Sequence, residues 1–282
     1  MFWLVDIFKF IFAIAIVGLH SWFLGSYQEW LYPVVYYSAV PYFFIASGFF
    51  FAKKYYVKGY SKEILPKFCK RLFTKLVVFE PISQIQVIIL LAIAGTTAST
   101  IFFDTVQHII FYPLGAMWYI QALLVAGFLL VPFIKYNKEK FIIPVGLVWY
   151  TFALICGRYY FLTEDISDLR LIVDNYLRYC ISPKNGVFIG FLYMGLGVLA
   201  AKNWNPLTER FKIRRINTVL FICTLLYFIE LYLISDYDGL EDGQYFLMQP
   251  WFVGALFLYS AQYYERPTRV KYKNTPPNCI IH

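Results

Sequence analysis

The stretch DIFKFIFAIAIVGLH (Asp6–His20) is apolar enough for a membrane helix, yet it contains three ionisable side chains. Ten residues that are apolar or glycine separate Lys9 from His20. An eleven-residue step is close to three helical turns, so both side chains fall on one face, about 16 Å apart along the axis. Asp6 lies one turn before Lys9 on nearly the same face. A charge at the centre of a bilayer costs about 2.5–3.5 kcal/mol on insertion scales. We therefore expect this stripe to face a bundle interior or a wet cavity.

The composition agrees with a membrane protein. The 282 residues are 60% hydrophobic and 15% charged, whereas soluble domains average about 45–50% apolar and about 25% charged residues. The first apolar segment has no basic n-region and no small-residue cleavage site, so we interpret it as a retained helix and not as a signal peptide. The five scattered cysteines predict no disulfide framework, and the three histidines form no local metal signature.

Hydropathy predicts an all-α, polytopic transmembrane helix bundle. A span needs about 20 apolar residues, and eight segments qualify: 2–24, 31–52, 72–94, 115–134, 141–160, 185–201, 216–235 and 246–264. The predicted domains are a transmembrane domain over 1–264 and a polar tail over 265–282, which is broken by prolines and cannot span a membrane.

Loop charges predict the orientation of these spans. Basic residues concentrate in every second connection and in the tail, as in KYNKEK and KNWNPLTERFKIRR, while the connections between them are neutral, mixed or acidic. The positive-inside rule then places both termini in the cytoplasm of a multi-pass protein, most simply in a bacterial plasma membrane. The net charge of +8 is a topology signal, and nucleic-acid binding is not predicted.

Depth in the membrane suggests two polar layers, an inner one (Asp6, Lys9, Glu80) and an outer one (His20, Glu230, Gln121). Two simpler interpretations stand beside this one. Asp6 and Lys9 can form a local ion pair, and His20 can be an interfacial anchor.

The first span resembles the acyltransferase 3 family of integral membrane acyltransferases, whose signature is Arg or Lys, ten residues, then His. Lys9 and His20 match it. Further similar blocks follow in the family's order: VPYFFIASGFFFA (Val40–Ala52), KFCKRLFTK (Lys67–Lys75), PLGAMWYIQALL (Pro113–Leu124) and KNGVFIGFLYMGLG (Lys184–Gly197). The last two blocks also resemble the membrane domain of vancomycin-type serine racemases.

Two departures from the family pattern are visible. Members usually have ten spans, so eight predict a truncated or a divergent short form of the fold. Lys184 stands where many relatives have arginine, and lysine keeps the charge but loses the bidentate fork.

The resemblance implies transfer of an acyl group, often acetyl, from cytoplasmic acyl-CoA to a hydroxyl of a cell-surface glycan or another exported acceptor. No permanently bound cofactor is implied. His20 is the expected general base, or alternatively the covalent carrier of the acyl group. Lys9 is expected to orient the donor or stabilise its charge, and Asp6 to fix the ammonium group. The remaining substrate-binding candidates are Lys70, Arg71, Glu230, Gln121, Trp118, Tyr119, Lys184 and Asn185.

Each of these assignments has a structural alternative. The basic cluster that is expected to hold the phosphates of CoA consists of Lys53, Lys54, Lys67, Lys70, Arg71 and Lys75. The same residues can serve as topology determinants that contact lipid headgroups. Trp118 and Tyr119 can be interface anchors, and Ser47-Gly48 is expected to allow close helix packing or a turn.

A second function class remains open from the sequence. Lys9, Glu80, His20 and Glu230 are also compatible with a proton or substrate relay in a transporter or flippase-like carrier. The similarity to the racemase membrane domains makes an amino acid one conceivable cargo. The sequence does not determine the acceptor, the acyl chain or the oligomeric state.

Overall fold

The computed structural model describes residues 2–21, 35, 37–58, 63–204, 209–235, 237 and 245–262. These residues form helices and no strands. The helices are α1 (Trp3–Ser21), α3 (Tyr37–Lys58), α4 (Ile64–Ile93), α5 (Ala98–Phe111), α6 (Met117–Lys135), α7 (Ile142–Ile155), α8 (Ser167–Cys180), α9 (Phe191–Lys202), α10 (Glu209–Leu233) and α11 (Gln249–Gln262), with short turns of helix η2 (Glu139–Phe141), η3 (Tyr160–Thr163) and η4 (Gly186–Gly190). The predicted all-α class is confirmed.

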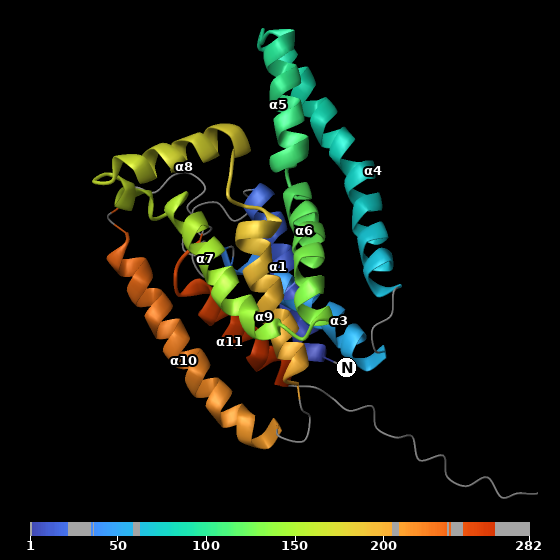
Figure 1. The fold of residues 1–282 in the computed structure, drawn as a ribbon, viewed down its shortest axis with the longest axis vertical. Coiled ribbons are helices and arrows are strands. Elements are labelled where there is room, and N and C mark those ends of the chain that lie inside the picture. The colour runs from blue at the N-terminus through green and yellow to red at the C-terminus, as the bar shows by residue number, and fades with distance from the viewer. Residues whose placement is uncertain are drawn as a thin grey trace, which may run out of the picture.

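The bundle is organised around α3 and α9, which form its closest helix pair. Helices α6 and α7 pack on α9, α1 packs on α3, and α11 lies against α3 and α10. Helices α4 and α5 extend as a hairpin beyond one side of the bundle, α10 borders the opposite side, and α8 crosses one end (Figure 1).

Three described segments are long and apolar enough to cross a membrane: α4, α6, and residues Arg215–Leu233 of α10. Side chains on α10 such as Phe221 and Tyr232 are 70% and 81% exposed, and a helix in water would not present them in such numbers. These helices support a membrane protein. The predicted count of eight spans is not confirmed, and the predicted polar tail, 265–282, lies outside the described residues.

Two glycines explain why α3 and α9 approach so closely. A Cβ atom built on Gly48 would lie 2.0 Å from the carbonyl oxygen of Met194, and one on Gly197 would lie 2.0 Å from that of Ile45. Each glycine therefore allows the backbone of the partner helix into the space that a side chain would fill. The prediction of close helix packing at Ser47-Gly48 is confirmed.

A buried hydrogen-bond network connects the middle of the bundle to α11. The Tyr193 hydroxyl donates to the side-chain oxygen of Gln249 over 3.0 Å, and the Tyr150 hydroxyl donates to the Phe246 carbonyl over 2.9 Å. The amide nitrogen of Gln249 in turn donates to the Tyr37 carbonyl over 2.7 Å. Satisfied polar groups of this kind fix one arrangement of helices.

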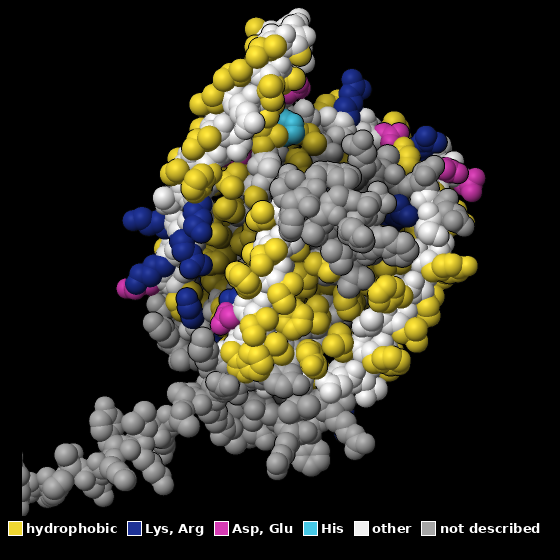
Figure 2. All heavy atoms as spheres, turned by 180° about the vertical axis from the view of Figure 1, so that it is seen from behind, with side chains coloured by type: hydrophobic (Ala, Val, Ile, Leu, Met, Phe, Trp, Pro, Cys, Tyr) yellow, Lys and Arg dark blue, Asp and Glu magenta, His cyan; other side chains and the backbone are white. Residues whose placement is uncertain are grey.

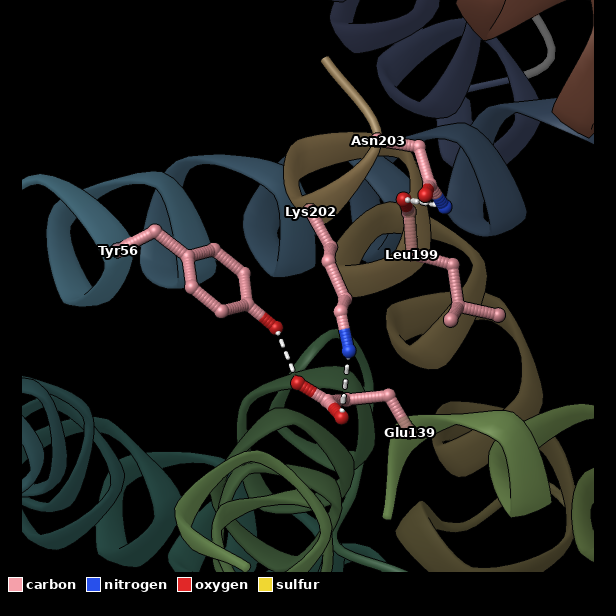
Figure 3. Close-up of polar contacts among 5 residues, drawn as sticks. All are labelled: Tyr56, Glu139, Leu199, Lys202 and Asn203. Atoms are coloured by element: carbon pink, nitrogen blue, oxygen red, sulfur yellow. Dashed lines mark hydrogen bonds and ion pairs between the residues drawn. The ribbon is translucent and has the colours of Figure 1, made fainter. Parts of the chain in front are cut away.

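An ion pair joins three elements at the end of the bundle where α3 and α9 finish. Glu139 of η2 is 1% exposed and accepts hydrogen bonds from Nζ of Lys202 and the hydroxyl of Tyr56, each 2.8 Å long (Figure 3). Burial alone would raise the pKa of Glu139. The hydrogen bonds from Lys202, from its own backbone N–H and from Tyr56, together with the Lys202 charge, hold the pKa below its ordinary value of 4.5.

This ion pair predicts a pH-dependent stability. A carboxyl group whose pKa is lower in the folded state contributes stability above its ordinary pKa, and the contribution is lost as the pH falls through the folded pKa. Glu139→Gln is expected to lower the unfolding free energy at neutral pH by about 1.5–3 kcal/mol. The gap in melting temperature to the wild type should close as the pH falls below 4.5 and through the lower pKa of the folded state. A gap that stays constant over this range in thermal unfolding would refute the assignment.

Candidate functional site

A cavity of about 650 Å³ lies between α1, α3, α4 and α6, within the range of small-molecule sites. Its charged lining residues are Lys9, Lys54, Glu63, Lys67 and Arg71. Its aromatic lining residues, the aromatic wall, are Phe43, Phe50, Phe51 and Phe68, and the lining is completed by Ala46, Ser47, Ile64, Leu72 and Leu123. Figure 2 shows the row of basic side chains beside the exposed apolar surface of the bundle.

Lys9 lines this cavity from α1. Its ammonium group lies 2.6 Å from a carboxylate oxygen of Asp6, and 5.3 Å from the centre of the Phe50 ring. The side chains of Lys9 and Asp6 are 33% and 47% exposed, so the pair is accessible and not sealed in the core. The predicted local ion pair is confirmed, and Lys9 faces a cavity as its position in an apolar span requires.

Basic side chains gather where α3 ends and α4 begins. Lys54, Lys67 and Arg71, which we call the basic mouth, line the cavity there. Glu63 is the acidic lining residue, and its carboxylate accepts a 2.5 Å hydrogen bond from Lys67. Four basic side chains and one acidic side chain therefore line the cavity, and two of the four, Lys9 and Lys67, are paired with Asp6 and Glu63. The remaining positive charge favours an anionic ligand.

Ser47 connects the cavity to a group of aromatic side chains on α6. Its hydroxyl lies 3.4 Å from that of Tyr119, and Tyr119 contacts Phe44 with ring centres 4.7 Å apart. Trp118 stacks on Tyr112 at 6.3 Å. Tyr119 is thus within reach of a lining residue, whereas Trp118 packs against other rings, and neither belongs to the lining itself.

The predicted inner layer, in which Glu80 lies at the depth of Lys9, is wrong. Glu80 is buried on α4 and accepts hydrogen bonds from Gln84 and from the backbone N–H of Leu114, over 2.7 and 3.2 Å. The reason is the length of α4, which begins at Ile64. Glu80 is therefore about 24 Å along the helix, level with the start of α6 and not with Lys9.

Glu230 holds the turn before α11. It accepts hydrogen bonds from the backbone N–H groups of Leu247 and Met248, over 2.5 and 2.7 Å, and from the hydroxyl of Tyr159. A carboxylate with these partners stabilises the start of a helix. Its predicted role in substrate binding remains a prediction, and the contacts give it a structural one.

The other candidates on α6 and before η4 also make structural contacts. Gln121 donates to the Ile110 carbonyl over 2.8 Å, at the end of α5. The side-chain oxygen of Asn185 accepts from the N–H groups of Val187 and Phe188, so Asn185 caps η4. Lys184 is 6% exposed beside it.

Only part of the predicted basic cluster lines the cavity. Lys70 and Lys75 are exposed on α4 and do not belong to its lining. Lys53 lies over the ring of Phe2, 4.2 Å from its centre. Helical periodicity explains why Lys70 is outside the lining, because Lys67 and Arg71 are four residues apart and share the face of α4 that meets the cavity. Lys75 follows Arg71 by one further turn and lies beyond the lining.

His20 belongs to α1, which is continuous from Trp3 to Ser21. The same helix therefore carries positions 9 and 20 on one stripe, as the eleven-residue spacing predicts. The side chain of His20 lies outside the described residues, so its predicted role remains a prediction.

Sequence reasoning did not identify Glu63, Phe43 or Leu123 as parts of the site. They reach the cavity through contacts between helices distant in the sequence. No local pattern signals such contacts. No group of three or more His, Cys, Asp or Glu side chains within the described part of the chain is arranged to hold a metal ion.

The apolar helices and the basic cavity beside the first helix define a class of membrane protein with a polar site inside its bundle. The comparison of sequences makes this class specific: the acyltransferase 3 family, described as an acyltransferase domain, matches residues 3–271, and the chain belongs to this family.

A second similarity is to an amino-acid racemase of Enterococcus faecalis, which is 22% identical over 257 residues. The match covers 87% of this chain and 34% of that protein, so the chain spans about a third of its length. No solved structure matches.

Proposed function

We propose that the protein transfers an acyl group, most simply acetyl, from acyl-CoA to a hydroxyl of a cell-surface glycan or another exported molecule. The observation that carries this proposal is the cavity that joins Lys9 to the basic mouth. Lysine and arginine are the side chains that hold phosphate groups, and CoA carries several of them. Family membership adds the acyl-transfer chemistry.

In the proposed reaction, the acceptor oxygen forms a bond to the acyl carbon while the bond from that carbon to the sulfur of CoA breaks. His20 takes the proton of the acceptor hydroxyl and returns it to the departing thiolate. Lys9 orients the donor from the wall of the cavity, and Asp6 fixes its ammonium group at 2.6 Å. Trp118 and Tyr119 are the proposed contacts of the acceptor.

We further propose eight spans in a bacterial plasma membrane, with both termini in the cytoplasm, on the basis of the alternating loop charges. The basic mouth then opens toward cytoplasmic acyl-CoA. A carrier function has less support, because Lys9, Glu80 and Glu230 each have separate partners among the described residues.

Removing the basic mouth is expected to weaken donor binding. The double variant Lys67→Gln/Arg71→Gln should raise the KM for acetyl-CoA by at least about tenfold, since a hydrogen bond to a charged group contributes about 1.5–3 kcal/mol. Because these contacts form equally in the ground and transition states, kcat should change little. Release of labelled acetate or transfer of the label by purified protein in nanodiscs measures both constants.

Lys70→Gln/Lys75→Gln is the matched control, with the same loss of charge on the same helix outside the cavity. If both double variants raise the KM equally, the charge of α4 acts nonspecifically and the proposed donor site is refuted. Substrate uptake into vesicles without consumption of acyl groups would instead favour the carrier.

A further inference from the structure

Ser47 of α3 is the uncharged polar side chain in the cavity lining, whose other described residues are charged or apolar. Threonines on other helices donate their hydroxyls to the carbonyl one turn before, as Thr151 does to Leu147 over 2.9 Å. Ser47 makes no such bond within the described part of the chain. Its hydroxyl lies 3.4 Å from that of Tyr119, which is longer than an ordinary bond between hydroxyls. The Ser47 proton is therefore available to a ligand in the cavity.

The position of Ser47 along the cavity follows from α3. Lys54, in the basic mouth, is seven residues after Ser47 and on the same face, which corresponds to about 10 Å along the axis. Phe43, at the far end of the lining, is about 16 Å from Lys54. A CoA molecule held by its phosphates at the basic mouth needs this length for its pantetheine arm. The thioester then lies in the far part of the cavity, near Ser47.

The surroundings of Ser47 strengthen any hydrogen bond that it makes. Its neighbours in the lining include Phe43, Ala46 and Phe50, and the ammonium group of Lys9 lies 5.3 Å from the centre of the Phe50 ring. In such apolar surroundings a fixed donor interacts more strongly with charge than it would in water. During acyl transfer, negative charge develops on the carbonyl oxygen of the thioester, and a donor held at that oxygen stabilises the transition state.

We infer that the Ser47 hydroxyl donates a hydrogen bond to the thioester carbonyl oxygen. This bond stabilises the charge that the oxygen gains when the acceptor oxygen bonds to the acyl carbon. The charge leaves with the thiolate when the carbonyl re-forms, and Ser47 forms no covalent bond. The inference rests on the proposed function and adds to it the group that polarises the donor.

Tyr119 has the part of a positioning residue in this arrangement. Its hydroxyl donates to the Ser47 oxygen and thereby turns the Ser47 proton toward the cavity. The Tyr119 ring is held by Phe44 and Phe43, with ring centres 4.7 and 6.4 Å away. Tyr119 does not line the cavity itself, so it acts on the donor through Ser47.

Steady-state transfer from acetyl-CoA by the full chain in nanodiscs tests the role of Ser47. Ser47→Ala is expected to lower kcat by about a hundredfold, the effect of removing one donor to a developing oxyanion. The KM for acetyl-CoA should change little, because the bond strengthens only in the transition state. Ser47→Thr keeps the hydroxyl and should retain most of kcat. Ser38→Ala is the matched control, on the same helix at a buried position outside the lining.

Infrared difference spectra of bound acetyl-CoA, isotope-labelled at its carbonyl carbon, give a readout that a packing defect would not move. The carbonyl band should lie at lower frequency in the wild type than in Ser47→Ala, because a hydrogen bond weakens the carbonyl bond. Tyr119→Phe should raise this frequency in the wild type. In the Ser47→Ala background it should have no further effect, as expected for two residues that act on one bond.

Unchanged kcat in Ser47→Ala overturns the inference, and a higher KM alongside it would place Ser47 at the pantetheine arm. The proposed function survives both results if Lys67→Gln/Arg71→Gln still raises the KM. An equal loss of kcat in Ser38→Ala would show a general effect of α3 and also overturn the inference. An equal effect of Tyr119→Phe in both backgrounds would end its assignment as a positioning residue. A wild-type protein that neither binds nor turns over acetyl-CoA would refute the proposed function as well.

Discussion

Gly48→Ala and Gly197→Ala are each expected to prevent formation of the folded bundle or to lower its melting temperature severely. The new methyl group would lie 2.0 Å from a carbonyl oxygen of the partner helix in both cases. Backbone cannot rotate away as a side chain can, so α3 and α9 must separate, and the contacts around them are lost. We expect a destabilisation at or above about 3 kcal/mol, the upper end of the usual range for overpacking.

Gly254→Ala is the matched control, because the nearest atom to its new methyl group, in Leu196, would be 3.8 Å away. Alanine favours a helix over glycine by about 1 kcal/mol, so this variant should be neutral or slightly stabilised. Recovery of monodisperse protein and thermal unfolding in detergent measure the difference. Equal behaviour of all three variants would contradict the assigned packing of α3 on α9.

His20→Ala is expected to lower kcat for acyl transfer by at least about a hundredfold, because a positioned general base contributes about 10²–10⁴. Lys9→Met should reduce kcat/KM strongly while the protein still folds, since its ion pair with Asp6 is partly exposed and such pairs contribute about 0–1 kcal/mol. The family signature accepts Arg or Lys, so Lys9→Arg should retain activity.

Labelled acetyl-CoA turnover and thermal unfolding of the same preparations provide the measurement. Normal turnover in a well-folded His20→Ala variant would end its assignment as the base. Loss of turnover in Lys9→Arg as severe as in Lys9→Met would show that charge at this position is not what matters.

The ion pair of Asp6 with Lys9 could be predicted from sequence because it depends only on spacing within one helix. The same holds for the shared face of Lys67 and Arg71. Charge and hydropathy were sufficient to predict the all-α membrane class. The bilayer core admits only apolar surfaces and backbones whose hydrogen bonds are made internally, so spanning helices are visible in the sequence.

Sequence reasoning failed where contacts are not local. Residues 98–111 and 167–180 fall in the outer connections between predicted spans, whereas they form α5 and α8. Each has 14 residues, below the length of about 20 that marks a span. The depth predicted for Glu80 was wrong for a related reason. Helix α4 begins at Ile64, in a basic segment that hydropathy does not include in a span, so Glu80 lies further along the helix than the predicted span places it.

The central claim is that acyl groups are taken from CoA through the basic mouth and that this mouth faces the cytoplasm. Membrane vesicles of opposite sidedness, prepared from cells that produce the protein, test it most directly when labelled acetyl-CoA is added outside. We predict turnover in inverted vesicles, little in right-side-out vesicles, and a loss in inverted vesicles that contain Lys67→Gln/Arg71→Gln. Equal turnover from both sides, or none in inverted vesicles that contain folded protein, would contradict the account.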